Sequence, residues 1–310
     1  MLGKLALPLM CAPMSFASSV GLAGTCCEAG IIGGWQGGSA TPDDAFDAYL
    51  KRLDAIGPAP PIVNIPARAA TDPAYAERLE RLAEFKVPLV LSSVGDPSML
   101  AVMVHDWGGR LIQDVTTMRH AAKAISAGVD GLMLTCAGAG GHTGFLSPMA
   151  FVPAIRREYD GFLIVSGGIA DAHGMAAALA LGGDLACMGT RFIATSESGV
   201  LDGHRAMIAQ AGADDITVSA AMNGVPANWI RQSIEQVGLD PETLSGTRMP
   251  MPDGIRPWRD IWSAGQSVAL IDKVEPVSEL VARLMSDFSA LAAGFKWQDR
   301  LARIDAGWAV

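Results

Sequence analysis

The sequence predicts an α/β fold: a closed (β/α)8 barrel that carries a small helical subdomain inserted after its eighth strand. Short apolar runs alternate with amphipathic helical stretches up to about residue 200, and repeated strand–helix alternation is typical of a parallel sheet. Eight such runs follow one another at a spacing of roughly 25 residues, which favours a barrel. An open doubly wound sheet would need fewer strands and a glycine-rich first turn.

Eight strands are expected in this barrel, each rich in Val, Ile, Leu or Met and short enough to be covered on both faces. They are residues 7–12, 31–35, 61–65, 87–92, 110–115, 131–136, 162–166 and 184–188. The first run, preceded by Lys4, could also be read as a short signal peptide. Pro8 and Pro13 interrupt it, which suits a signal helix poorly, so we assign it to the first barrel strand.

Helices are expected between the strands because several stretches open with a capping residue or a proline. Thr41 precedes one of them and Asp72 another, while Gly128 and Gly182 follow helical stretches where a left-handed cap is favoured. The predicted barrel helices are 45–56, 74–85, 97–104, 118–127 and 170–181.

The alternation stops after the eighth strand. Helical stretches at 204–211 and 227–237 end in a loop rich in Pro, Gly and Met, and helices at 261–270 and 277–292 are expected to return to the barrel. We therefore predict a barrel formed by residues 1–200 and 258–310, with 201–257 as an inserted helical lid. In that insert Asn223 (within Met222–Gly224) and Trp229 are candidates for substrate contact, although ordinary packing is the favoured explanation for them.

Composition narrows the class of protein. The net charge is −9 and no run of Lys or Arg is present, which argues against a nucleic-acid partner. No apolar run reaches about 20 residues, so no membrane span is predicted, and no cluster has metal-ligand spacing. The odd count of five cysteines favours reduced thiols in a cytoplasmic protein, with the adjacent Cys26 and Cys27 read as packing residues rather than a redox pair.

Two glycine motifs follow the last two predicted strands. Ser166-Gly167-Gly168-Ile169 comes after the seventh strand, and Met188-Gly189-Thr190 begins the segment after the eighth. Glycines allow backbone N–H groups to approach a phosphate, and the helix that follows Gly168 would direct its positive end there. Because barrels often bind phosphate with these two loops, the pair predicts a phosphate-bearing cofactor or substrate.

A third glycine-rich segment, residues 135–144, leaves the sixth strand and surrounds His142. Such a loop can lie flat against a planar ligand, and the histidine would stand at the barrel mouth as an acid, a base or a hydrogen-bond donor to an anion. The exit of the first strand, Ala12-Pro13-Met14, offers rigid backbone groups to a ring edge. Asn64 ends the third strand and can both donate and accept hydrogen bonds, which suits a flavin.

Taken together, these segments resemble the nitronate monooxygenase family, formerly called 2-nitropropane dioxygenases. The resemblance covers most of the chain and includes Ala12–Met14, Asn64, Ala139–His142, the glycine turns after strands seven and eight, and the Ser263–Ser267 segment. The superfamily of FMN-dependent TIM barrels to which the family belongs also holds flavin-type enoyl-acyl-carrier-protein reductases and NADH:quinone reductases.

The resemblance implies FMN as the cofactor, with a nitronate or nitroalkane and dioxygen as the partners. Alkyl nitronates would be oxidised to carbonyl compounds and nitrite, and His142 would orient the nitronate or abstract the α-proton of a nitroalkane. A homodimer is one of the assemblies expected for such a chain. The residues assigned to FMN are Ala12, Pro13, Met14, Asn64, Thr135, Gly140, Gly141, Ser166, Gly167, Gly168, Cys187, Met188, Gly189 and Thr190, the last four through their backbone.

The chain departs from the family at two positions. Thr135 stands where the family has a glutamine that contacts FMN, and Gly138 replaces a glutamate of the glycine loop. The second change removes a carboxylate that would raise the pKa of His142. Two alternatives stay open: an NAD(P)H-dependent flavin reductase of quinones or enoyl thioesters, and a non-redox barrel that binds a phosphorylated metabolite.

Overall fold

The computed structural model describes residues 2–38, 43–53, 57–244 and 246–294. Eight parallel strands close into a barrel in which β1 pairs with both β2 and β9. All eight predicted strands are confirmed, including the first. They are β1 (Leu9–Cys11), β2 (Ile32–Gln36), β3 (Pro61–Pro66), β4 (Leu89–Ser93), β5 (Arg110–Val115), β6 (Gly131–Thr135), β8 (Phe162–Ser166) and β9 (Leu185–Met188).

Helices follow the strands, as predicted from their caps. The side chains of Asp72, Thr117 and Asp171 each accept a hydrogen bond from a backbone N–H near the start of a helix. The barrel helices are α1 (Val20–Glu28), α2 (Asp43–Leu53), α3 (Ala76–Glu84), α4 (Ser98–Asp106), α5 (Met118–Ser126), α6 (Pro148–Arg156), α7 (Ala172–Ala180) and α8 (Thr190–Ile193). Residues 54–56 and the expected cap at Thr41 lie outside the described residues.

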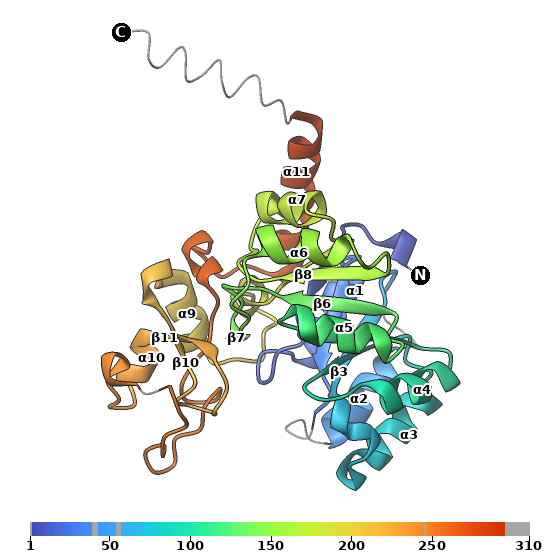
Figure 1. Ribbon diagram of the computed structural model, residues 1–310. Helices are drawn as coiled ribbons and strands as arrows, with labels where there is room; N and C mark the ends of the chain where they lie inside the picture. The colour runs from blue at the N-terminus through green and yellow to red at the C-terminus, as the bar shows by residue number, and fades with distance from the viewer. Residues whose placement is uncertain (1, 39–42, 54–56, 245, 295–310) are drawn as a thin grey trace.

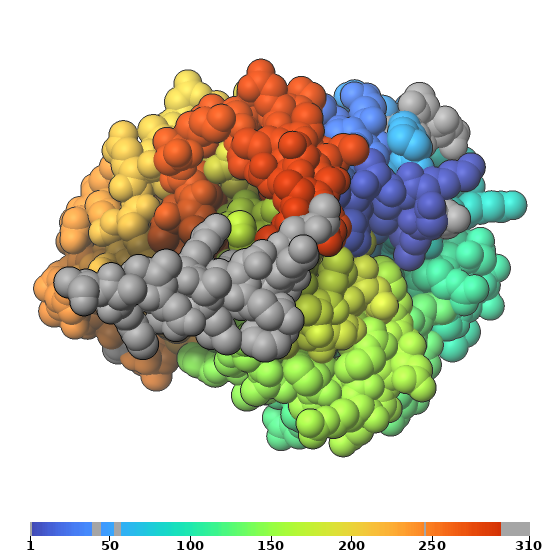
Figure 2. Space-filling view, turned by 90° about the horizontal axis from the view of Figure 1, so that it is seen from above, coloured from blue at the N-terminus to red at the C-terminus, as the bar shows by residue number. Residues whose placement is uncertain are grey.

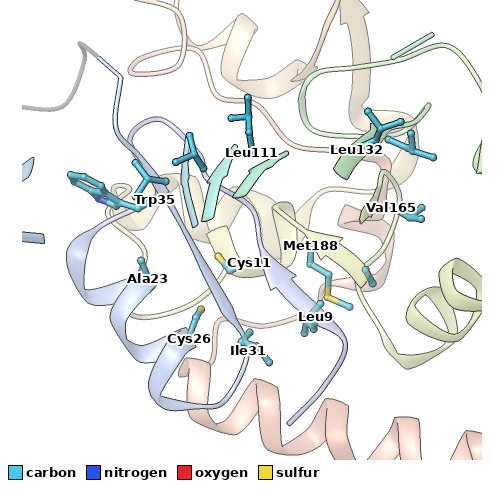
Figure 3. Packing of buried hydrophobic residues seen from close by; sticks show 14 of the residues in the cluster. Leu9, Cys11, Ala23, Cys26, Ile31, Trp35, Leu111, Leu132, Val165 and Met188 are labelled. Carbon is cyan, nitrogen blue, oxygen red and sulfur yellow. The ribbon is translucent and has the colours of Figure 1, made fainter. Parts of the chain in front are cut away.

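Two apolar layers hold the barrel together. One fills the barrel interior and includes Met10, Ile62 and Ile112. The other lies between the strands and the surrounding helices, where Leu132, Val165 and Met188 point outward (Figure 3). Successive side chains of a strand alternate between these layers, so each strand fixes which residues can reach the barrel mouth.

The cysteines belong to these packed layers. All five are free thiols and buried, and burial raises the pKa of Cys27 to about 12. A thiol that stays protonated at neutral pH is a poor nucleophile, so Cys26 and Cys27 on α1 are packing residues, as predicted.

The segment after β9 differs from the predicted all-helical insert. The expected helix 204–211 is present as α9 (Asp202–Gln210), but the expected helix 227–237 is a strand, β11 (Ala227–Ile230), followed by the short α10 (Arg231–Glu235). β11 pairs antiparallel with β10 (Ile216–Ser219) on one side and with β7 (Gly141–His142) on the other. This three-stranded sheet joins the insert to the glycine loop of the barrel (Figure 1).

The chain then returns to the barrel. Of the expected helix 261–270 only a 3-10 turn forms, Gln266–Leu270, because 261–265 runs extended across the glycine loop. The last expected helix is confirmed as α11 (Val277–Gly294), which packs against α7 and α1 (Figure 2). No helix among the described residues is long and apolar enough to cross a membrane.

Candidate active site

A cavity of about 1550 Å³ opens at the carboxyl ends of the barrel strands. Nearly all of the residues predicted to bind FMN line it, together with His142. They are Ala12, Pro13, Met14, Asn64, Thr135, Gly140, Gly141, Ser166, Gly167, Gly168, Cys187, Gly189 and Thr190. Residues far apart in sequence therefore converge on one space, at the barrel face where catalytic groups of this fold lie.

Met188 is the exception: it is not among the residues that line the cavity, and only its backbone was predicted to contact the flavin, which stays a prediction. Its side chain is fully buried in the layer between the strands and the helices (Figure 3). Cys187 occupies the interior position of β9, and the alternation along a strand turns the next side chain outward. Met188 still contributes its carbonyl oxygen, which accepts a hydrogen bond from Ala12 N–H at 2.9 Å.

A ring of polar side chains forms the cavity floor. Leu91, Ile112 and Met133 belong to the apolar barrel interior, and the interior position two residues further along each of their strands is polar. The ring residues lining the cavity are Gln36, Asn64, Ser93, Asp114, Thr135 and Ser166. Asn64, Thr135 and Ser166 were predicted from the sequence, whereas Gln36, Ser93 and Asp114 were not. The alternation of side chains along β4 and β5 is the sequence signal that identifies Ser93 and Asp114.

The two glycine turns lie side by side. Ser166 of β8 pairs in register with Cys187 of β9, so Gly168 and Gly189 each follow that pair by two residues. Gly168 has a φ of 73°, and no described atom lies within 4 Å of the position that a Cβ would take there. This conformation favours glycine, and the open space leaves its backbone accessible from the cavity.

The helix after the first turn contributes less than the sequence indicated. The Asp171 carboxylate caps α7 by accepting a hydrogen bond from Gly174 N–H at 2.8 Å. A carboxylate at this position offsets the positive end of the helix dipole. An anion over the glycine turns would therefore rely on the backbone amides of the turns themselves.

The glycine loop, residues 135–144, carries His142. It is held in place by the segment that returns to the barrel, residues 261–265 (the returning segment). A Cβ on Gly140 would lie 2.7 Å from Gly265 N, so the two backbones meet in a contact that excludes any larger residue at 140. Gly141 N–H donates to Ser263 Oγ at 2.7 Å, and Gly265 N–H donates to Thr190 Oγ1 at 2.8 Å. The returning segment is thus tied to both the glycine loop and the second glycine turn.

His142 lies on β7, with its ring at the cavity and exposed to it. Asn223 Nδ2 lies 3.1 Å from His142 Nε2, and the Trp258 ring meets the imidazole edge-on at 5.5 Å between centroids. Val225 N–H donates to Asn223 Oδ1 at 3.0 Å, which directs the amide nitrogen toward the imidazole. An amide nitrogen can only donate, so Nε2 accepts and the neutral ring carries its proton on Nδ1.

The pKa of His142 is lowered from its ordinary value because the surrounding protein desolvates the ring. A carboxylate beside the ring would have the opposite effect, and the position where the family has one is Gly138, with a φ of 87°. His142 is therefore neutral at pH 7 and suited to donate a hydrogen bond from Nδ1.

Other candidates in the insert divide into two groups. Met222 and Trp229 are buried in an apolar cluster of the insert and neither lines the cavity, so packing is their role, as favoured from the sequence. Asn223, by contrast, reaches the proposed catalytic histidine. Among the described residues no group of three His, Cys, Asp or Glu side chains could hold a metal ion.

A closed parallel barrel with a large cavity at the carboxyl ends of its strands defines a TIM-barrel enzyme. The sequence model of the nitronate monooxygenase family matches residues 62–287. The chain belongs to this family. It is an oxidoreductase, and the family implies a flavin cofactor.

Individual relatives agree with this assignment. A nitronate monooxygenase of Paraburkholderia phytofirmans is 29% identical over 89% of this chain and 91% of its own length. The (3aS,4S,5R,7aS)-5-hydroxy-7a-methyl-1-oxo-octahydro-1H-indene-4-carboxyl-CoA dehydrogenase of Mycobacterium tuberculosis is 27% identical over 73% of this chain and 64% of its own. Among solved structures, FabK from Thermotoga maritima superposes with a TM-score of 0.78 at 27% identity, over 94% of this chain and 96% of that one.

Proposed function

We propose that the protein is an FMN-dependent nitronate monooxygenase, which oxidises alkyl nitronates with dioxygen to carbonyl compounds and nitrite. One observation carries the proposal: the two glycine turns, the polar floor and His142 line a single cavity. The site residues proposed for FMN are those predicted from the sequence, without the side chain of Met188.

The cavity suits a phosphorylated flavin. Gly168 and Gly189 both line the cavity, and backbone amides of such glycine turns can bind a phosphate. On the floor, Asn64 Nδ2 already donates to Leu91 O and Ser93 Oγ, so Asn64 offers its Oδ1 as an acceptor. The Ser166 hydroxyl can donate or accept, so together they suit a ring with a mixed polar edge. The bound flavin would supply the redox chemistry, while the chain supplies position and electrostatics.

His142 would bind and orient the substrate. Its Nδ1–H can donate a hydrogen bond to an oxygen of the nitronate, and the neutral ring keeps that donor available at pH 7. Abstraction of an α-proton would need a free lone pair on Nε2, which Asn223 occupies. The geometry therefore favours a nitronate, already deprotonated, over a neutral nitroalkane.

We further propose that residues 201–257 act as a lid over this site. Val225 and Pro226 of the insert line the cavity, and Asn223 contacts His142. A lid of this kind excludes water from the reacting groups.

The direct test is the absorbance spectrum of the purified protein during anaerobic titration with a primary nitronate. The proposal predicts a yellow protein whose flavin bleaches with the nitronate and recovers with dioxygen, whereas the neutral nitroalkane reacts more slowly. A colourless protein that does not take up FMN would contradict the flavin assignment and favour a barrel for a phosphorylated metabolite.

A second function, NAD(P)H-dependent reduction of an enoyl thioester or a quinone, is favoured by one relative that is named for a CoA thioester. Anaerobic mixing with NADH or NADPH separates the two functions. Rapid bleaching by either would favour the reductase, and bleaching by the nitronate alone favours the monooxygenase.

A further inference from the structure

Asp114 is a carboxyl group on the polar floor that the proposed function does not use. It lies on β5 two residues after Ile112, which packs in the barrel interior, so its side chain shares the interior face and lines the cavity. The other five ring residues are neutral: Gln36, Asn64, Ser93, Thr135 and Ser166. Asp114 is thus the acidic member of the ring on which the flavin is proposed to lie.

Thr135 fixes this carboxyl group. Its hydroxyl donates to Asp114 Oδ1 at 2.6 Å, within the range of a strong hydrogen bond to a charged acceptor. The proton of Thr135 is committed to Asp114, so the threonine presents only lone pairs to a ligand. At the position where the family has a neutral glutamine, this chain therefore has a threonine joined to an acid.

We infer that Asp114, positioned by Thr135, is a functional residue of the proposed flavin site: its negative charge opposes electron uptake by the bound flavin and adds to the pH dependence that the reduction potential already has from the flavin's own proton uptake. The inference rests on the proposed flavin site. Two-electron reduction of FMN takes up one or two protons, and the ring gains a negative charge when it takes up only one. A carboxylate in a poorly solvated site disfavours a second negative charge nearby.

Asp114 changes its charge within the pH range from 5 to 8, in which the potential can be measured. Burial raises its pKa to about 6, against the hydrogen bond from Thr135, which lowers it. Above this pKa the floor carries a negative charge, and below it the floor is neutral. The opposition to flavin reduction is therefore present at pH 8 and lost as the pH falls toward 5.

Other titratable groups face the same cavity from neighbouring elements: Asp96, Arg119, His120, Lys123, His142, Cys187 and His204. Burial raises the pKa of Cys187, and also raises that of Cys136, the residue after β6, to about 12, so both stay thiols. Burial lowers the pKa of His204 to about 4. Substitution of His120 and of His142 separates their contributions to the pH dependence of the potential from that of Asp114.

The test is the midpoint potential of the FMN-loaded protein between pH 5 and pH 8, compared with Asp114→Asn. The isosteric amide removes the charge, so we expect the variant to have a more positive potential at pH 8. The expected shift is at least tenfold in the reduction equilibrium, which is about 30 mV for a two-electron couple. The difference from the wild type should disappear toward pH 5.

Three variants serve as controls. His120→Ala and His142→Ala should keep the wild-type pH dependence near pH 6. Thr135→Val removes the donor to the carboxylate, so it should raise the pKa of Asp114 and move the inflection to higher pH. Parallel curves for Asp114→Asn and the wild type, or an inflection that vanishes in a histidine variant, would overturn the inference while leaving the flavin site intact. A protein that takes up no FMN would overturn both.

Discussion

The floor of the cavity belongs to one closed parallel barrel, whereas the wall above it is an antiparallel sheet in which β7 of the barrel loop pairs with β11 of the distant insert, which in turn pairs with β10. Floor residues such as Asn64 and Thr135 reach the cavity because side chains alternate along a strand and theirs point to the barrel interior. In the wall, His142 is held by Asn223 and by the pairing of β7 with β11. The difference suggests that the barrel binds the cofactor while the added segments select and orient the substrate.

The largest expected effect concerns the contact that anchors the chain beyond the returning segment to the barrel. Glu275 is 4% exposed and pairs with Arg191 of α8, itself 1% exposed. Glu275→Ala would leave a buried guanidinium unpaired beside Arg283, which costs about 3–5 kcal/mol. Urea unfolding measures the loss.

Lys273→Ala is the control, because it removes a half-exposed partner of the same carboxylate and should cost less than about 1 kcal/mol. Equal losses of stability in the two variants would show that burial of the Glu275–Arg191 pair is unimportant.

The next effect separates the wall from the floor. His142→Ala should keep bound FMN, because the glycine turns are unchanged, but slow substrate-driven flavin reduction by roughly 10²-fold or more. Anaerobic stopped-flow absorbance measures both properties. His173→Ala, an exposed histidine on α7 outside this cavity, is the matched control. Unchanged single-turnover kinetics in His142→Ala would contradict the assignment.

A smaller effect is expected at Asn223, which positions His142 without entering the reaction. Asn223→Ala removes the donor to Nε2, so the pKa of His142 should rise and substrate-driven flavin reduction should slow by about tenfold, the effect of one hydrogen bond of about 1.4 kcal/mol. Asn223→Asp places an acceptor and a negative charge there, so it should raise that pKa further. NMR titration of the imidazole provides the pKa, and an unchanged value in both variants would exclude the positioning role.

The sequence predicted the floor better than the wall, for a physical reason. Barrel strands carry a local signal, the apolar run, and the glycine turns follow directly from where each run ends. The same reasoning identifies Asp114, since its side chain lies on the same face of β5 as that of Ile112. β7, with two residues, has no periodicity at all, and it pairs with a strand that joins directly to α10. A short apolar run such as 227–230 is ambiguous between strand and helix, and only the distant partner resolves it.

The central claim is that the amides of the two glycine turns bind the phosphate of a flavin that lies on the polar floor. The affinity of the flavin-free protein for FMN, measured beside that for riboflavin by fluorescence quenching, tests it most directly. Charge-assisted hydrogen bonds of about 1.5–3 kcal/mol each predict that FMN binds at least about 10²-fold more tightly. Equal affinity for the two flavins would show that the turns around Gly168 and Gly189 bind no phosphate, and would contradict the account.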